Sequence, residues 1–286
     1  MTNFDNFDII KLMNSRMRRK QGIPGLIVFT IICLVIVSGF ALLRFSPKIV
    51  VAQAPKTPQK VKVNKKLAEP TVDLNKFVVD LSAWQRPQDI DYNVLSQQII
   101  GAIVRVQNGP LKAEDGSAKK DGEDKAYQTH ITELQKRGVP VAVYAYVNGK
   151  SNADMVQQAK DFYNRAHKYH PTYYWLDVEE DQMKDLNGGI EAYRAELAKL
   201  GVKHIGIYAQ DWFITANKID TSKFTSIWMA DYGNNTGYWN ASPDTTLTYD
   251  MQQFTDQGTL NGFDGHFDLN MIRTQAQYDK LFKGKD

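Results

Sequence analysis

The segment Tyr173-Tyr174-Trp175-Leu176-Asp177-Val178-Glu179-Glu180 joins a short apolar run, rich in residues that favour β-structure, to an acidic end. Side chains two residues apart on a strand point to the same face, so Asp177 and Glu179 should project together while Val178 packs on the other face. Paired carboxylates suit the hydrolysis of a glycosidic bond, in which one group donates a proton and the other stabilises positive charge. The alternative is a solvated acidic strand end that leads into a loop.

Strand-like segments alternate with helical patterns over residues 74–286. The strand-like segments are residues 77–81, 99–107, 140–147, 172–179, 204–209, 224–231, 248–254 and 265–272. Helical patterns cover residues 125–137, 152–170 and 190–200. This alternation predicts an α/β fold with a parallel sheet, an irregular (β/α) TIM-like barrel with short or missing helices late in the chain. A doubly wound open sheet is the alternative, although no glycine-rich phosphate loop follows the first strand.

Acidic residues recur where the predicted strands end. Asp80 ends the first strand, Asp177 and Glu179 end the fourth, Asp231 ends the sixth, and Asp268 lies in the last. In a barrel of this type the carboxyl ends of the strands share one rim, where catalytic groups lie. Acids that are distant in sequence should therefore meet in one site. For each acid alone, a loop start or a helix cap is an equally good explanation.

Aromatic residues fall at the same predicted rim, namely Trp84, Tyr144, Tyr146, Tyr208, Trp212, Trp228 and Tyr232. Flat apolar faces with polar tips suit the C–H faces and hydroxyls of sugars, although about half of these rings should belong to the core. The five histidines show no metal-binding spacing, and no cysteine, lysine or serine nucleophile arrangement is present, so no cofactor is expected. A metal held by carboxylates alone is the alternative.

The N-terminal part of the chain has the pattern of a membrane anchor. Residues 22–43 carry no charge and are nearly all apolar, which predicts a transmembrane helix. Basic residues crowd segment 1–21, so this end is expected in the cytoplasm and the bulk of the chain outside it. A cleaved signal peptide is the alternative, because Ala52-Gln53-Ala54 resembles a cleavage site. The only cysteine, Cys33, lies in the predicted span, so the exported part has no thiol chemistry.

The net charge of +3 is divided unevenly along the chain. Residues 1–70 hold 12 Lys/Arg against 3 Asp/Glu, whereas the remainder holds 23 against 29. A nucleic-acid-binding protein would carry the basic surface on its folded domain, so nucleic acid is excluded as a partner. The positive charge lies beside the predicted span, where anionic lipids would attract it. Residues 44–73, rich in Pro, Lys, Val and Gln, predict an extended linker to one domain.

Short motifs follow one another along residues 77–281. They are Val79-Asp80-Leu81-Ser82, Trp84-Gln85, Ile90-Asp91-Tyr92, Ile103-Val104-Arg105, Val143-Tyr144-Ala145-Tyr146, Leu176-Asp177-Val178-Glu179, Gly206-Ile207-Tyr208, Ile227-Trp228-Met229-Ala230-Asp231-Tyr232, Tyr249-Asp250-Met251-Gln252-Gln253-Phe254 and Phe267-Asp268-Leu269-Asn270. In their order and spacing they resemble glycoside hydrolase family 25, the N-acetylmuramidase lysozymes that cut peptidoglycan. The four acids of that family's active site have counterparts in these motifs.

The resemblance implies a role for each of these acids. Glu179 would be the general acid that protonates the leaving glycosidic oxygen. Asp177 would orient the 2-acetamido group of the substrate or stabilise the oxazolinium-like species that it forms, and direct attack by water stays open beside this substrate-assisted route. Asp80 and Asp268 would shape the electrostatics and hold sugar hydroxyls. The expected substrate-binding residues are Tyr144, Tyr146, Tyr208, Trp228, Asp231 and Gln253.

Three features depart from the family's pattern. Tyr92 stands where the family usually has Trp, and Gln252 and Phe254 flank Gln253 where Trp and Tyr are usual. The loop over residues 108–124 is long, polar and lysine-rich. These departures bear on substrate preference more than on catalysis, because the four acids are intact.

We therefore expect a bacterial, membrane-anchored muramidase that hydrolyses the β-1,4 bond between N-acetylmuramic acid and N-acetylglucosamine outside the cytoplasm. A tethered enzyme suits wall remodelling or local wall opening for a secretion or transfer apparatus, and an exported phage lysin is another reading. Two further alternatives are a non-catalytic module that binds wall glycan and a carboxylate-metal polysaccharide deacetylase.

Overall fold

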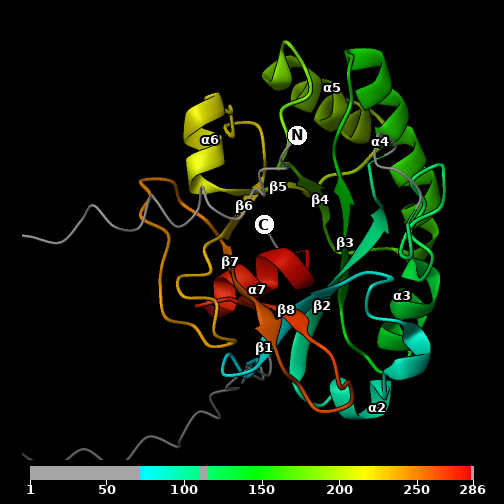
Figure 1. Cartoon of the computed structure of the whole chain (residues 1–286), viewed down its shortest axis with the longest axis vertical. Coiled ribbons are helices and arrows are strands. Elements are labelled where there is room, and N and C mark those ends of the chain that lie inside the picture. Colours follow the sequence, from blue (N-terminus) through cyan, green and yellow to red (C-terminus); the bar gives the residue numbers. More distant parts are fainter. Residues whose placement is uncertain (1–70, 110–114, 285–286) are drawn as a thin grey trace, which may run out of the picture. The chain divides into compact units, whose positions relative to one another are not determined.

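The chain forms a closed eight-stranded barrel in the computed structural model, which describes residues 71–109 and 115–284 (Figure 1). The strands are β1 (Phe77–Leu81), β2 (Ile99–Gln107), β3 (Val141–Tyr146), β4 (Tyr174–Asp177), β5 (Ile205–Gln210), β6 (Ser226–Ala230), β7 (Met251–Gly258) and β8 (Phe267–Met271). Each strand lies within or overlaps one of the predicted segments. The barrel expected from the sequence is therefore confirmed, and the open-sheet alternative is wrong.

The expectation of a parallel sheet is wrong for the last strand. β1 to β7 pair in parallel, each with the next strand along the chain. β8 runs antiparallel to both β7 and β1. Only residues 259–266 connect β7 to β8, which is too short for the crossover that a parallel pair requires. The start of β8 therefore lies at the rim formed by the carboxyl ends of the other strands.

Helices surround the barrel and become short toward the end of the chain, as expected (Figure 1). They are η1 (Pro87–Asp89), α2 (Tyr92–Leu95), α3 (Tyr127–Gln135), α4 (Asn152–Ala166), η2 (His167–Tyr169), α5 (Leu186–Lys199), α6 (Asp211–Asn217) and α7 (Gln275–Phe282). α5 begins at Leu186 rather than at residue 190, because the Asp185 side chain caps it by accepting a hydrogen bond from the Gly188 N–H at 2.9 Å. The predicted helix over residues 152–170 is divided between α4 and η2.

Two hydrophobic layers follow from the alternation of side chains along the strands. One layer lies between the barrel and the helices, and Leu176 of β4 belongs to it together with helical residues such as Phe162. The other layer fills the barrel and includes Trp175 of β4. Helix α7 adds Phe282 to this interior layer, and its Tyr278 hydroxyl donates to the Ile100 carbonyl oxygen at 3.2 Å near the start of β2. The interior is thus packed below the rim.

The predicted membrane anchor cannot be compared with this fold. The segments 1–21 and 22–43 and most of the linker over residues 44–73 lie outside the described residues. Between residues 71 and 284, leaving out 110–114, no helix has the length and apolar character needed to cross a membrane.

Close packing inside the barrel leads to a stability prediction at Gly206 of β5. A Cβ atom at this position would lie 2.2 Å from Cζ3 of Trp175. We expect Gly206→Ala to lower the free energy of unfolding by about 1–3 kcal/mol, because a buried indole must shift to accept the methyl group. Thermal unfolding followed by circular dichroism would measure the loss. Gly116→Ala is the matched control, since its Cβ would meet the Trp84 ring at 3.5 Å, an ordinary contact. Equal loss in both variants would contradict this packing.

Candidate active site

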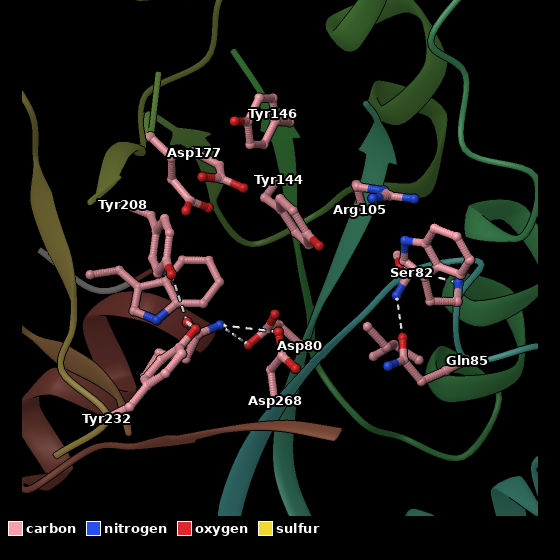
Figure 2. Close-up of a pocket in the computed structure, with 15 residues that line it drawn as sticks. Asp80, Ser82, Gln85, Arg105, Tyr144, Tyr146, Asp177, Tyr208, Tyr232 and Asp268 are labelled. Atoms are coloured by element: carbon pink, nitrogen blue, oxygen red, sulfur yellow. Dashed lines mark hydrogen bonds between the residues drawn. The ribbon is translucent and has the colours of Figure 1, made fainter. Parts of the chain in front are cut away.

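A cavity of about 250 Å³ opens at the rim of the barrel (Figure 2). Every strand contributes at least one of its lining residues. These residues are Asp80, Leu81, Ser82, Trp84, Gln85, Arg105, Tyr144, Tyr146, Asp177, Glu179, Tyr208, Trp228, Tyr232, Gln253 and Asp268. Four of the five acids that the sequence placed at one rim, all except Asp231, therefore meet in a single cavity.

The end of β4 supplies one pair of acids. Asp177 is only 6% exposed, and its Oδ1 has no hydrogen-bond partner among the described residues. Glu179, two residues later, is exposed and lines the same cavity. Burial, and next the negative charge of Glu179, raise the pKa of Asp177 well above its ordinary value. Asp177 thus holds its proton to a higher pH than an exposed carboxyl, beside a second carboxyl that solvent can reach.

The pairing of β1 with β8 supplies the second pair of acids. It places Asp80 opposite Asp268 in register. Burial raises the pKa of Asp80 to about 6, against the lowering effect of hydrogen bonds from neighbouring amides. Burial and the charge of Asp80 raise the pKa of Asp268 well above its ordinary value. Since neighbouring carboxylates resist double ionisation, Asp268 keeps a proton while Asp80 ionises first.

An indole and an amide together position Asp80. The Trp228 indole N–H donates to Oδ1 of Asn270 at 2.7 Å. Because an indole nitrogen can only donate, the Asn270 amide nitrogen must face the other way, and it donates to Asp80 Oδ2 at 2.7 Å. The buried ring of Trp228 therefore sets the direction of a hydrogen bond to a cavity acid.

Two tyrosines and a second amide position the same oxygen (Figure 2). The hydroxyls of Tyr208 and Tyr232 donate to Oε1 of Gln253 at 2.6 Å and 2.5 Å. The Gln253 amide nitrogen then donates to Asp80 Oδ2 at 2.9 Å and lies 3.5 Å from Asp268 Oδ2. Asp80 Oδ2 thus accepts two amide hydrogens, which favours its ionised form over that of Asp268.

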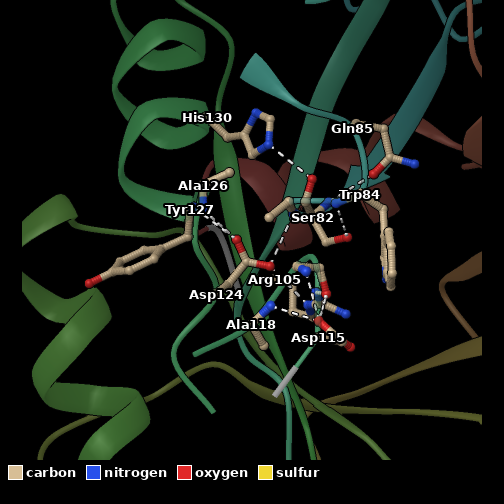
Figure 3. Close-up of polar contacts among 12 residues, drawn as sticks. Ser82, Trp84, Gln85, Arg105, Asp115, Ala118, Asp124, Ala126, Tyr127 and His130 are labelled. Carbon is tan, nitrogen blue, oxygen red and sulfur yellow. Dashed lines mark hydrogen bonds and ion pairs between the residues drawn. The ribbon is translucent and has the colours of Figure 1, made fainter. Parts of the chain in front are cut away.

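Arg105 of β2 lines the cavity and also anchors the described part of the long polar loop, residues 115–124 (Figure 3). Its Nε lies 3.0 Å from Asp124 Oδ2, and its Nη2 donates to Ser117 Oγ at 2.6 Å. Asp124 also accepts from the Ala83 backbone N–H at 3.0 Å, which ties the loop to the segment after β1. The long polar loop, one of the three features that depart from the family's pattern, therefore supports the cavity wall through Arg105.

Tyr92, the second departure, acts on the cavity through two other residues. Its hydroxyl donates to Nδ1 of His130 at 2.7 Å. His130 Nε2 lies 3.0 Å from the carbonyl oxygen of Ser82 (Figure 3). A carbonyl only accepts, so Nε2 carries the proton. Burial lowers the pKa of His130 to about 4, which keeps the ring neutral. The hydrogen-bonded pair of Tyr92 and His130 therefore fixes the position of Ser82, which lines the cavity.

The third departure lies on the outer side of β7. Gln252 accepts a hydrogen bond from the Trp239 indole at 3.3 Å, and Phe254 packs on Phe77 with ring centroids 5.6 Å apart. Neither Gln252 nor Phe254 lines the cavity. The side chains of this pair therefore pack behind β7, while Gln253 between them faces the acids.

Five of the six predicted substrate-binding residues line the cavity together with the acids, and these are Tyr144, Tyr146, Tyr208, Trp228 and Gln253. Asp231 does not, because it follows β6 and its Oδ1 accepts from the Gly233 N–H at 3.0 Å in a neighbouring hollow. Arg105 and Asn270 were not predicted as site residues, although Arg105 lines the cavity and Asn270 donates to Asp80. Arg105 could have been recognised, since it is the one charge in the apolar run of β2.

This arrangement, a barrel whose rim joins two pairs of acids to aromatic walls, defines a glycoside hydrolase by fold and site. No group of three or more His, Cys, Asp or Glu side chains is set to hold a metal ion in the ranges that the structure describes. The model of "Glycosyl hydrolases family 25" matches residues 79–263. The chain belongs to this family and is a lysozyme-like enzyme, as the sequence motifs predicted. Membership of this family favours an enzyme that cleaves glycosidic bonds over the two alternatives, a non-catalytic glycan-binding module and a deacetylase.

Solved structures show the same fold. A glycosyl hydrolase 25 of Streptococcus pneumoniae, a virulence factor participating in host cell invasion, is 50% identical over 73% of this chain and 94% of its own, with a TM-score of 0.72. The catalytic domain of endolysin ply40 from Listeria monocytogenes bacteriophage P40 is 24% identical over 73% and 98%, with a TM-score of 0.64. The autolysin LytC of S. pneumoniae, in complex with a synthetic peptidoglycan ligand, is 21% identical over 69% and 46%, with a TM-score of 0.54. A search of curated proteins found no match.

The raised pKa of Asp80 predicts how stability depends on pH. The folded state binds more protons than the unfolded state between pH 3.8 and about 6, so this group's contribution to stability is present below that window and is lost as pH rises through it. Asp80→Asn should remove up to about 3 kcal/mol of the change in the free energy of unfolding across this pH window. Chemical unfolding of both proteins from pH 4 to pH 8 would measure it. The exposed Asp264→Asn is the control. Parallel profiles for wild type and Asp80→Asn would contradict the burial of an ionising Asp80.

Proposed function

We propose that this chain hydrolyses peptidoglycan at the β-1,4 bond between N-acetylmuramic acid and N-acetylglucosamine. The observation that carries the proposal is the buried, proton-retaining Asp177 beside the exposed Glu179 in an aromatic-lined cavity. Family membership supports a glycan substrate. The peptidoglycan ligand bound to LytC, a protein with the same fold, supports this choice of glycan.

Glu179 is the general acid of the proposed reaction. Its carboxyl donates a proton to the leaving glycosidic oxygen as the bond from the anomeric carbon to that oxygen breaks. Water adds its hydroxyl to the anomeric carbon, and its remaining proton returns to the carboxyl groups. Asp177 orients the 2-acetamido group or stabilises the oxazolinium-like species. In the proposed reaction the proton that Asp177 retains passes to the adjacent Glu179, which donates it to the leaving oxygen, so Asp177 carries a negative charge when the positive charge develops.

The second pair of acids, Asp80 and Asp268, stabilises the positive charge that develops on the sugar and holds its hydroxyls. Asp80, ionised above about pH 6, presents negative charge to the sugar ring from the opposite side of the rim. Its two amide donors fix its position before substrate binds, so little reorganisation is needed during the reaction. Asp268, which retains its proton, serves as a donor to sugar hydroxyls.

Replacing the general acid tests this assignment. Glu179→Gln should lower kcat by about 10²–10⁴-fold, because the leaving oxygen then lacks a proton donor. It should leave the melting temperature unchanged, since residue 179 is exposed. Release of borohydride-reducible muramic acid ends from purified peptidoglycan, identified by mass spectrometry, gives the rate. Glu180→Gln, a change at the neighbouring acid that does not line the cavity, is the matched control. Near wild-type lysis by Glu179→Gln would reject the role.

We further propose that the enzyme is anchored in the cell membrane by one span, with its N-terminus in the cytoplasm and its barrel outside. The support lies in the sequence, in the uncharged segment 22–43 and the basic segment 1–21 that precedes it. The linker over residues 44–73 would hold the barrel between membrane and wall. That position suits wall remodelling, or local opening of the wall for a secretion or transfer apparatus.

Cysteine labelling tests this topology, because Cys33 is the only native cysteine. In a Cys33→Ala background, Gln59→Cys should react with a membrane-impermeant maleimide on intact cells stripped of wall. Ser15→Cys should react only after the membrane is opened, since the predicted span separates the two positions. The product should also keep its full-length mass and sediment with membranes. A protein that lacks about the first 54 residues and is released into the medium would instead establish a cleaved signal peptide.

A further inference from the structure

A second hollow of about 300 Å³ adjoins the acidic cavity at the rim. It is lined by Gln210, Asp211, Trp212, Ala230, Asp231, Tyr232, Gly233, Pro243 and Asp244. These residues come from the ends of β5 and β6, the start of α6 and the segment between β6 and β7 (Figure 1). Tyr232 lines both spaces, and its hydroxyl is part of the Gln253 network, so the hollow and the cavity share this residue as a common wall.

Trp212 offers an exposed aromatic face in this hollow. It is 63% exposed, whereas Trp228 is 1% exposed inside the barrel. Its indole N–H donates to Oε1 of Gln210, and its ring packs edge-on against Phe213 with centroids 5.6 Å apart. A large apolar ring held in place in contact with water is a ready platform for a flat apolar face.

The charged groups of the hollow are carboxylates, which accept hydrogen bonds. No protein hydrogen-bond partner is found for the carboxylates of Asp211 and Asp244 among the described residues, and Asp231 uses one oxygen for the Gly233 N–H. These acceptors match the hydroxyl and amide hydrogens of an N-acetylhexosamine. They oppose a stem peptide, because its free carboxylates would meet three negative charges.

We propose that this hollow is a sugar-binding subsite that holds a further, neutral N-acetylhexosamine of the glycan strand, stacked on Trp212. The inference rests on the proposed function, since the strand enters the hollow from the cavity where it is cut. The platform contributes affinity for strands that are long enough to reach it, and short glycans are cut without its help.

A chain-length comparison with the full-length protein tests the subsite. The probes are peptide-free peptidoglycan oligomers of four and eight sugars, together with an eight-sugar oligomer that keeps its stem peptides. Wild type should have a higher kcat/KM for eight sugars than for four. Trp212→Ala should lower kcat/KM for the eight-sugar oligomer about three- to tenfold, as for the loss of one aromatic contact, and leave the four-sugar value unchanged. The matched control is Tyr238→Ala, which removes a ring that is 78% exposed and lines neither space.

Each other outcome overturns a definite claim. Equal loss on both chain lengths, or the same loss in Tyr238→Ala, would overturn the subsite, because the ring would then act through folding or general surface contact. Loss confined to the peptide-bearing oligomer would assign the hollow to the stem peptide instead. Cleavage without any dependence on length would overturn the subsite alone, whereas wild type that cuts none of the oligomers would overturn the proposed function itself.

Discussion

The antiparallel pairing of β8 with β1 is the contact on which the rest of the site depends. It closes the barrel, and it sets Asp268 opposite Asp80 at the rim. Asp268 is the second residue of β8, so a parallel β8 would carry it to the amino end of the barrel, away from Asp177. The reversal of one strand therefore brings acids from both ends of the domain sequence into one cavity.

Burial of these acids costs stability, and the barrel offsets part of the cost with directed donors. Asn270 and Gln253 each donate an amide hydrogen to Asp80, and each is turned toward it by an aromatic donor on its other side. Trp228 belongs to the interior hydrophobic layer and to this network at once. Packing and electrostatics are thus coupled, because a shift of the ring would also turn an amide away from a carboxylate.

The features that distinguish this chain from its family's usual pattern lie behind the cavity wall. Tyr92 reaches Ser82 through a neutral His130, and the loop before α3 is held to Arg105 through buried Ser117 and Asp124. Such residues do not touch the acids, yet they set the position of those that line the cavity.

The sequence by itself determined the elements and the chemistry of the rim. Apolar runs that end in acid located the strands, because burial and strand geometry are local requirements. The start of α5 was missed because Gly188 and Gly189 interrupt the helical pattern, whereas Asp185 supplies a cap that precedes it. The order and spacing of the short motifs between Val79 and Asn270 indicated the family, whose model matches residues 79–263.

Only the tertiary structure decided which side chains meet and what their neighbours do to them. The direction of β8 depends on a short connection together with closure against β1. Among similar aromatic residues, Trp228 is buried in the barrel and Trp212 stays exposed in a second hollow, a difference that local sequence does not encode. The raised pKa of Asp177 likewise arises from burial and from charges on other segments. Desolvation and repulsion depend on distances through space, and those distances exist only once the barrel has closed.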